Sequence, residues 1–259
     1  MLQQTQVERV VPRWRAFLER FPTVAACAAC PAGDVLEEWA GLGYNRRALN
    51  LWRAAGVVVE RHGGAFPTTL ADLLALPGVG PYTARAVLAF ALEADVGVLD
   101  TNVARVLARR AGRPLGAREA QSAADAAVPV GRGWAWNQAM LDLGATTCRA
   151  RAPRCGECPV ARGCAWAEGG RAAPDPAIGS AGAPGGQSRF AGSDRQGRGR
   201  LVAALRAGPV AVLELAAVMG WPEDEARAAR VASAVVADGL AVEAGGAFSL
   251  PGRCAGAHK

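Results

Sequence analysis

Apolar residues recur at helical spacing along most of the first two thirds of the chain. The first series follows i, i+3, i+4 and i+7, and it predicts an amphipathic helix that buries Val7, Val10, Val11, Trp14, Phe17 and Leu18. Similar series before Pro77 and after Asp100 indicate two further helices. No apolar stretch is long and uninterrupted enough for a membrane span. The pattern therefore predicts a mostly α-helical protein with no membrane partner.

The pattern changes twice beyond residue 168. Residues 169–199 are rich in Gly, Pro, Ala and Ser and show no periodicity, which is typical of a flexible linker. Residues 200–253 predict three short helices, one of them over Val210–Met219, and a hairpin that turns on Gly245 and Gly246. Together these elements describe a small winged-helix-like α+β module, suited to auxiliary DNA contact or to packing. We therefore expect a main domain over residues 1–168, a linker and a C-terminal module.

A glycine-rich turn separates two of the predicted helices. Gly78 and Gly80 permit a tight turn with exposed backbone amides, and Pro81 suits the first position of the following helix. Unpaired N–H groups at a helix start form an anion site, and DNA phosphate is the expected ligand. An ordinary turn is the alternative. Further along, Asp100 precedes a helical series and is expected to cap that helix.

Four cysteines lie close together near residue 150. Cys148, Cys155, Cys158 and Cys164 follow the spacing C-x6-C-x2-C-x5-C in a segment broken by proline and glycine. Four thiolates in so short a span can hold one [4Fe–4S] cluster or one zinc ion. Two disulfides are the alternative, but the chain shows no secretory signal, which indicates a reducing cytoplasmic compartment. A second pair in the Cys27–Cys30 segment lacks partner ligands and is expected to act as two small apolar residues.

Together these motifs resemble the helix-hairpin-helix DNA glycosylase superfamily that carries a C-terminal iron–sulfur loop. The resemblance covers residues 1–165 and includes the segments Met1–Val7, Gly41–Tyr44 and Asn137–Gly144, each similar to the A/G-specific adenine glycosylase branch. It implies a six-helix domain and an iron–sulfur domain, with a [4Fe–4S] cluster on the four cysteines. It also implies base excision repair of double-stranded DNA by a nucleoid-associated, monomeric enzyme that removes adenine mispaired with guanine or 8-oxoguanine.

The resemblance assigns catalytic roles to three residues. Asp100 would stabilise the sugar cation left when the base departs, and Asn102 would orient the water or the sugar. Tyr82 occupies the position at which bifunctional relatives carry a nucleophilic lysine. The only lysine of this chain is Lys259, so a Schiff base is not available in the glycosylase domain and a monofunctional hydrolysis is expected. A capping role for Asp100, an exposed polar role for Asn102 and a packing role for Tyr82 are the structural alternatives.

The resemblance also indicates which residues contact DNA. Gln4 and Thr5 would open the first helix beside the lesion, Leu42 and Tyr44 would contact the base opposite the adenine, and the turn of Gly78, Val79 and Gly80 would bind phosphate. The net charge of +6 and the pI near 9.3 suit a polyanionic partner. Arginines inside the first cysteine loop are candidates for further phosphate contacts: Arg149, Arg151 and Arg154.

Two departures from the family pattern qualify these expectations. The family's general-acid glutamate lies two residues before the methionine that matches Met1, so the chain is expected either to continue upstream or to bind mispairs without catalysis. The larger C-terminal domain that recognises 8-oxoguanine in well-known relatives has no counterpart here. An endonuclease III-like glycosylase/lyase acting on pyrimidines remains the other enzymatic alternative.

Overall fold

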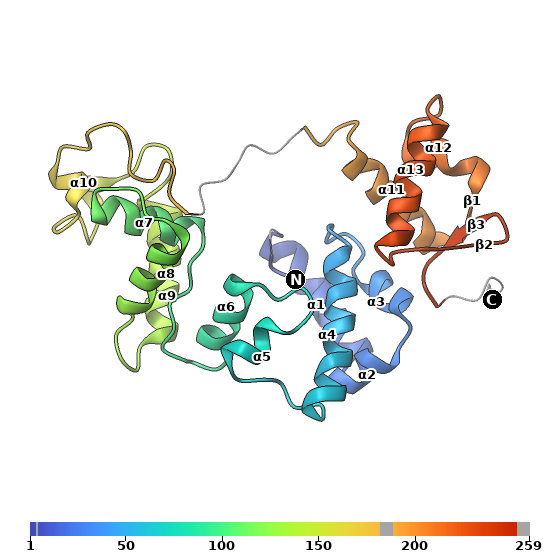
Figure 1. The fold of residues 1–259 in the computed structure, drawn as a ribbon, viewed down its shortest axis with the longest axis horizontal. Helices are drawn as coiled ribbons and strands as arrows, with labels where there is room; N and C mark the ends of the chain where they lie inside the picture. The colour runs from blue at the N-terminus through green and yellow to red at the C-terminus, as the bar shows by residue number, and fades with distance from the viewer. Residues whose placement is uncertain (4, 182–188, 253–259) are drawn as a thin grey trace. The chain divides into compact units, whose positions relative to one another are not determined.

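The computed structural model describes residues 1–3, 5–181 and 189–252 (Figure 1). The described chain is mostly helical, and its strands form one three-stranded antiparallel sheet. None of the described helices is long and apolar enough to cross a membrane. The contacts divide the chain into two compact units. Unit 1 contains Met1–Pro67, Leu76–Gly78 and the described part of Ser188–Lys259, and unit 2 contains Thr68–Ala75 and the described part of Val79–Gln187.

The first part of unit 1 is formed by four helices, α1 (Val7–Arg20), α2 (Val24–Ala29), α3 (Ala32–Glu38) and α4 (Arg46–His62). Helix α1 begins two residues after Thr5, so the predicted helix start at Thr5 is wrong. The Thr5 hydroxyl instead accepts a hydrogen bond from the Arg47 guanidinium (2.9 Å). Gln4 lies outside the described residues. Of the six apolar side chains expected to be buried by the first helix, only Val10 and Phe17 are buried.

The C-terminal module of unit 1 contains helices α11 (Asp194–Ala207), α12 (Leu215–Met219) and α13 (Glu225–Ala237), with strands β1 (Val210–Ala211), β2 (Val242–Ala244) and β3 (Ala247–Ser249). The predicted hairpin over β2 and β3 is confirmed, and β3 is central in the order β1-β3-β2. The predicted helix over Val210–Met219 is wrong in its first half, because Val210 pairs with Phe248 as a strand before a 3-10 turn leads into α12.

One apolar core joins the four N-terminal helices to the C-terminal module. Buried side chains of both parts pack in a single cluster, which includes Leu36, Trp39, Leu42, Leu49, Leu201, Leu205, Met219, Val235 and Leu250. Close backbone approach accompanies this packing: a Cβ added to Gly33 would lie 2.6 Å from the Pro251 carbonyl oxygen, which accepts the Gly33 N–H. The C-terminal module is therefore an integral part of unit 1.

Unit 2 contains α5 (Leu70–Leu74), α6 (Pro81–Ala91), α7 (Thr101–Ala111), α8 (Ala117–Ala126), α9 (Gly133–Asp142) and α10 (Ala165–Glu168). A π-helical turn over Leu143–Thr147 follows α9 and leads directly into Cys148. Helix α7 packs against α8, α9 and α10 (Figure 1). Its apolar side chains lie in the core of this unit. The residues that share this core include Val103, Val106, Leu107, Leu115, Ala120, Ala124 and Met140.

Part of the range expected to be a linker is anchored to unit 2. Asp175 forms an ion pair with Arg109 (2.6 Å), whose side chain is 2% exposed. The buried Ser180 hydroxyl accepts the Leu115 N–H (3.2 Å) and donates to the Pro176 carbonyl (2.6 Å). On the other side of the undescribed residues 182–188, helix α11 begins at Asp194, inside the range expected to be linker.

Candidate active site and cysteine cluster

The glycine turn between α5 and α6 has the predicted local geometry. Gly78 has φ +75°, and a Cβ there would lie 2.6 Å from side-chain atoms of Asn50, so glycine is required by both conformation and space. Gly80 precedes α6 with an extended backbone, and Pro81 occupies the first turn of the helix. Gly78 and Gly80 are exposed and Val79 is half-buried, which leaves the turn accessible to a ligand.

Asp100 is the N-cap of α7, as predicted from its position. Its Oδ1 accepts the Val103 N–H (2.7 Å), and its Oδ2 accepts a hydrogen bond from Asn102 Nδ2 (3.0 Å). Both carboxylate oxygens are thereby oriented at the N-terminus of α7. The capping role and a catalytic role for Asp100 are compatible, because the carboxylate remains half-buried rather than enclosed.

Tyr82 lies in the electrostatic neighbourhood of Asp100. Burial raises the pKa of the Tyr82 hydroxyl above its usual value, and the negative charge of Asp100 raises it further. The phenol is therefore protonated at neutral pH and can donate a hydrogen bond. Tyr82 is 42% exposed, so packing against the protein interior accounts for only part of its surroundings. Unit 2 thus brings together the three side chains that the sequence analysis named as catalytic.

The segment that leads to Asp100 is held by side chains from three helices. The buried Asn137 of α9 accepts the Val98 N–H (2.7 Å) and donates to the Val96 carbonyl (2.8 Å). Asp125 of α8 accepts the Gly97 N–H (2.9 Å), and Arg85 of α6 pairs with Asp125 (2.5 Å). These bonds satisfy consecutive backbone groups immediately before Asp100 and fix the approach of the chain to α7.

Helix α7 connects Asp100 to the cysteine loop through hydrogen bonds. Arg105 donates to Asn102 Oδ1 (2.8 Å), to the Gly144 carbonyl (2.6 Å) and to the Cys148 carbonyl (2.7 Å). One turn further along, the buried Arg109 donates to Cys148 Sγ (3.3 Å). Arg109 also stacks over the Trp166 ring, with 4.6 Å between Cζ and the ring centroid, and pairs with Asp175.

The four cysteines near residue 150 are free thiols that line one cavity. Apolar and aromatic side chains of Val106, Pro153, Val160 and Trp166 line the same cavity, and Arg105 and Arg109 supply positive charge beside Cys148. Four sulfur donors around one enclosed space suit a four-thiolate metal centre. Burial raises the pKa of the Cys148 thiol above its usual value, and the positive charges of Arg109 and Arg105 oppose this rise. In the described part of the chain, no group of three or more Cys, His, Asp or Glu side chains lies close enough together to coordinate a metal ion.

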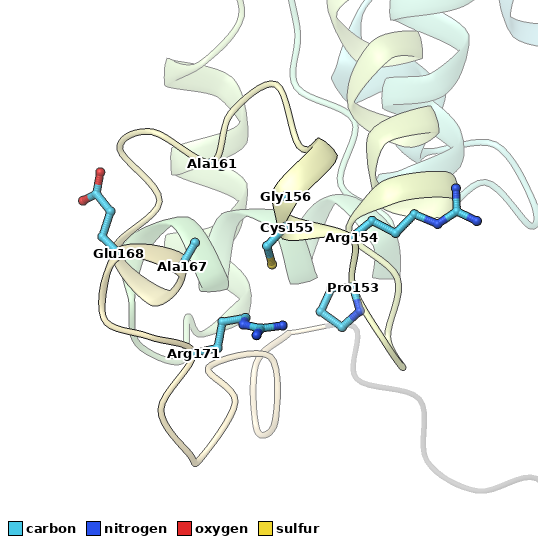
Figure 2. A pocket seen from close by; sticks show the side chains of 8 residues that line it. All are labelled: Pro153, Arg154, Cys155, Gly156, Ala161, Ala167, Glu168 and Arg171. Carbon is cyan, nitrogen blue, oxygen red and sulfur yellow. The ribbon is translucent and has the colours of Figure 1, made fainter.

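A second, open cavity of about 440 Å³ is also lined by Cys155. Figure 2 shows the Cys155 side chain at this cavity, with the Arg171 guanidinium extended toward Pro153 and the Arg154 guanidinium turned away. Cys155 is the one cysteine of the cluster that lines both cavities. Arg154 is exposed and 3.7 Å from Glu157, and Arg151 is also exposed.

In unit 1, the loop Gly41–Tyr44 is organised by Arg47. Its guanidinium donates to the carbonyls of Leu42 (2.9 Å) and Gly43 (3.2 Å) and to the Thr5 hydroxyl. It also lies over the Tyr44 ring, 5.6 Å from the centroid. Tyr44 is 46% exposed, whereas Leu42 is only 4% exposed and packs in the core. Of the two loop side chains named for DNA contact, Tyr44 is therefore the one at the surface.

Several residues that position the site were not predicted from the sequence. Arg47 and Arg109 each gather partners from three or more segments, and Asp125 and Asp175 pair with arginines 40 and 66 residues away. Asn137 was part of a quoted motif, but its contact with Val98 had no local signal. Its polar side chain within the largely apolar stretch of residues 134–141 is the one sequence signal that points to Asn137.

Comparisons with known proteins agree with this geometry. Residues 1–127 match the family model described as "HhH-GPD superfamily base excision DNA repair protein". The chain is 40% identical to the adenine DNA glycosylase of Mycolicibacterium smegmatis over 97% of this chain and 85% of the relative. It is also 40% identical to the human adenine DNA glycosylase, over 62% of this chain and 31% of that protein.

Solved structures support the same fold. A thermostable thymine-DNA glycosylase aligns with a TM-score of 0.60 at 27% identity, over 65% of this chain and 80% of that one. An endonuclease III–DNA covalent intermediate aligns with a TM-score of 0.57 at 23% identity, over 65% of this chain and 81% of that one, which is a likeness of fold alone. The helix-hairpin-helix glycosylase fold predicted from the sequence is confirmed. The chain belongs to the adenine DNA glycosylase family of HhH-GPD base excision repair proteins.

Proposed function

We propose that this protein removes adenine mispaired with guanine or 8-oxoguanine by hydrolysing the N-glycosidic bond, without cutting the DNA strand. The observation that carries the proposal is the cluster at the start of α7, where Asp100 is oriented by Asn102 and by the Val103 amide beside a protonated Tyr82. Cleavage of the bond leaves positive charge on the sugar, and a fixed carboxylate stabilises such a charge without reorganisation.

The absence of a nucleophilic amine supports the monofunctional reaction. Tyr82 stands at the position where a lyase would carry its lysine, and the chain's single lysine is Lys259. A phenol has no amine and forms no Schiff base, so water is the nucleophile that adds to the sugar cation and then loses a proton. The Asn102 amide, which donates to Asp100, keeps the second carboxylate oxygen turned toward the α7 N-terminus.

We further propose that DNA is bound at the glycine turn and at the loop Gly41–Tyr44. The turn of Gly78, Val79 and Gly80 precedes the N-terminus of α6, and backbone amides at such a position bind phosphate. Tyr44 is an exposed aromatic at a loop tip, suited to stacking in an opened base step. The resemblance adds Gln4 and Thr5 as proposed DNA contacts near the lesion, and Leu42 as a proposed contact to the base opposite the adenine.

The four cysteines are proposed to hold a [4Fe–4S] cluster. Cys148, Cys155, Cys158 and Cys164 would be its ligands, and the positive charges of Arg105 and Arg109 lie beside Cys148. When bound, such a cluster cross-links the loop between residues 148 and 164, so that Arg149, Arg151 and Arg154 are presented on a fixed scaffold. Iron and sulfide analysis of purified protein tests this proposal, and zinc with no sulfide would overturn it.

The test of the activity is the release of free adenine from duplexes with a single A·G or A·8-oxoguanine pair, with an A·T duplex as control. Because the resemblance places the general acid before Met1, the assay uses both this chain and a form extended by the codons that precede Met1 in its gene. Release of adenine with the strand intact supports the proposal. Strand cleavage or borohydride trapping of a DNA adduct would support a lyase, and mispair binding without release by either form would support a non-catalytic protein.

A further inference from the structure

The loop that presents Tyr44 is strained. Tyr44 has φ +47°, a left-handed conformation that a bulky side chain rarely adopts, and its neighbours Gly41 and Gly43 also have positive φ. Its ring is nonetheless 46% exposed, so apolar burial does not explain the conformation. A strained residue persists only where its surroundings hold it in place. The contacts of the next three residues show what holds Tyr44.

Each of these three residues is bonded to a different partner. Asn45 precedes α4 but does not cap it; its Oδ1 instead accepts a hydrogen bond from Arg206 of α11 (2.8 Å). Arg46 forms an ion pair with Asp238 at the end of α13. Arg47 bonds back to the loop itself and to the Thr5 hydroxyl. Two of the three anchors therefore come from the C-terminal module.

The module's two anchoring side chains are themselves fixed. Arg206 donates from Nε to the Leu36 carbonyl (2.9 Å), which ties α11 to α3 and orients the guanidinium toward Asn45. Asp238 is also paired with Arg198 of α11, so its carboxylate bridges two helices of unit 1. The apolar core beneath is continuous, since Leu42 packs in the same cluster as Leu201 and Leu205. The anchors thus lie on a rigid base.

We propose that the C-terminal module is a brace that holds Tyr44 in its strained, exposed conformation, with Arg206 acting through Asn45 and Asp238 acting through Arg46. The inference rests on the proposed function, because it assigns to the brace the presentation of Tyr44 to mispaired DNA. Arg206 and Asp238 are positioning residues, since they contact the loop base and not the ligand. The brace lowers the cost of ordering the loop when DNA binds, and mispair discrimination is the property it supports.

The test combines a measurement on the free protein with one on the complex. Hydrogen exchange of the amides in residues 41–47 is followed for Arg206→Gln, for Asn45→Ala and for Asp238→Asn. Arg230→Gln is the matched control, because Arg230 pairs with Asp194 inside the module and is 65% exposed. The affinity of each variant for an A·8-oxoguanine duplex and for a fully paired duplex is then measured, and the ratio of the two affinities is compared.

The brace predicts exchange in residues 41–47 that is about ten-fold faster in the three variants, with unchanged exchange in α7 of unit 2. It also predicts a loss of roughly five-fold or more in the affinity ratio, with little change in binding to paired DNA. Asn45→Ala leaves the module intact, so its effect cannot come from unfolding of the module. Equal exchange in wild type and Asn45→Ala, or the same acceleration in Arg230→Gln, would overturn the brace. A wild type without mispair preference refutes the proposed function, while the exchange data still decide the brace.

Discussion

The clearest test of how the site is built is the substitution Asn137→Ala. Asn137 is 2% exposed and makes three side-chain hydrogen bonds, to the Val98 N–H (2.7 Å) and to the carbonyls of Val96 and Gly133 (2.8 Å each). Alanine removes all three bonds, and Val98, which is fully buried, keeps an N–H without this acceptor. The substitution therefore combines lost hydrogen bonds with a desolvated donor in the segment that leads to Asp100.

The magnitude follows from these contacts. A buried donor left without a partner costs about 1–3 kcal/mol, and each of the other two bonds contributes about 0.5–1.5 kcal/mol, so the total lies at about 2–6 kcal/mol and a loss of at least about 3 kcal/mol is expected. For a domain of about 100 residues this lowers Tm by roughly 10–20 °C. Because Val98 lies two residues before Asp100, the rate of adenine release should also fall by at least about ten-fold, with DNA affinity preserved.

Stability is measured by urea unfolding, monitored by tryptophan fluorescence. Activity is measured by single-turnover adenine release, and affinity by duplex binding. Gln138→Ala is the matched control, since Gln138 is the exposed neighbour of Asn137 on the same helix. The control should lose less than about 0.5 kcal/mol, as is usual for surface positions. A loss below about 1 kcal/mol for Asn137→Ala, or equal losses for both variants, would refute the reasoning.

Three further predictions follow from the structure. Asp100→Asn should slow adenine release by a factor of about 10²–10³. The free energy of unfolding should change by about 1 kcal/mol or less, because asparagine also caps helices. Asp224→Asn, which alters the N-cap of α13, should leave the rate unchanged in the same assay. Gly78→Ala should destabilise the protein in thermal unfolding, whereas Gly80→Ala should not, because a Cβ at Gly78 meets Asn50 and one at Gly80 meets nothing within 4 Å. The hydrogen bond and charge of the buried Arg109 hold the pKa of Asp175 below its usual value. The Arg109–Asp175 pair therefore contributes stability above the ordinary carboxyl pKa of about 3.9, and this contribution is lost as pH falls through the lowered value. Asp175→Asn should weaken the fall in the free energy of unfolding at acid pH, and an unchanged pH dependence would count against the pair.

Local signals were sufficient to predict the elements that carry the proposed chemistry. Asp100 caps α7 and Pro81 opens α6 because a few neighbouring residues decide such positions. The hairpin on Gly245 and Gly246 is correct for the same reason, since both glycines have positive φ. In each case the determining interactions lie within one or two turns of chain, and the sequence pattern contains them.

The features that the sequence did not reveal depend on distant partners. Val210 is a strand because it pairs with Phe248, and no helix signal in Val210–Met219 reports that partner. Helix α1 has six apolar residues on helical spacing, yet only the stripe of Val10 and Phe17 meets the core of unit 1. Composition also gives no sign that Asp175, inside the range expected to be a linker, pairs with an arginine 66 residues earlier in the chain.

Helix α7 connects the Asp100 carboxylate to the cysteine loop. Asn102, Arg105 and Arg109 are spaced by three and four residues, so they share one face of the helix. At one end of that face, Asn102 donates a hydrogen bond to the Asp100 carboxylate. At the other end, Arg105 donates to the Cys148 carbonyl and Arg109 donates to the Cys148 sulfur. A helix moves as a rigid element, so we expect displacement of the cysteine loop to be transmitted to the N-terminus of α7. We therefore predict that a disrupted cysteine loop shifts the Asp100 carboxylate and slows adenine release.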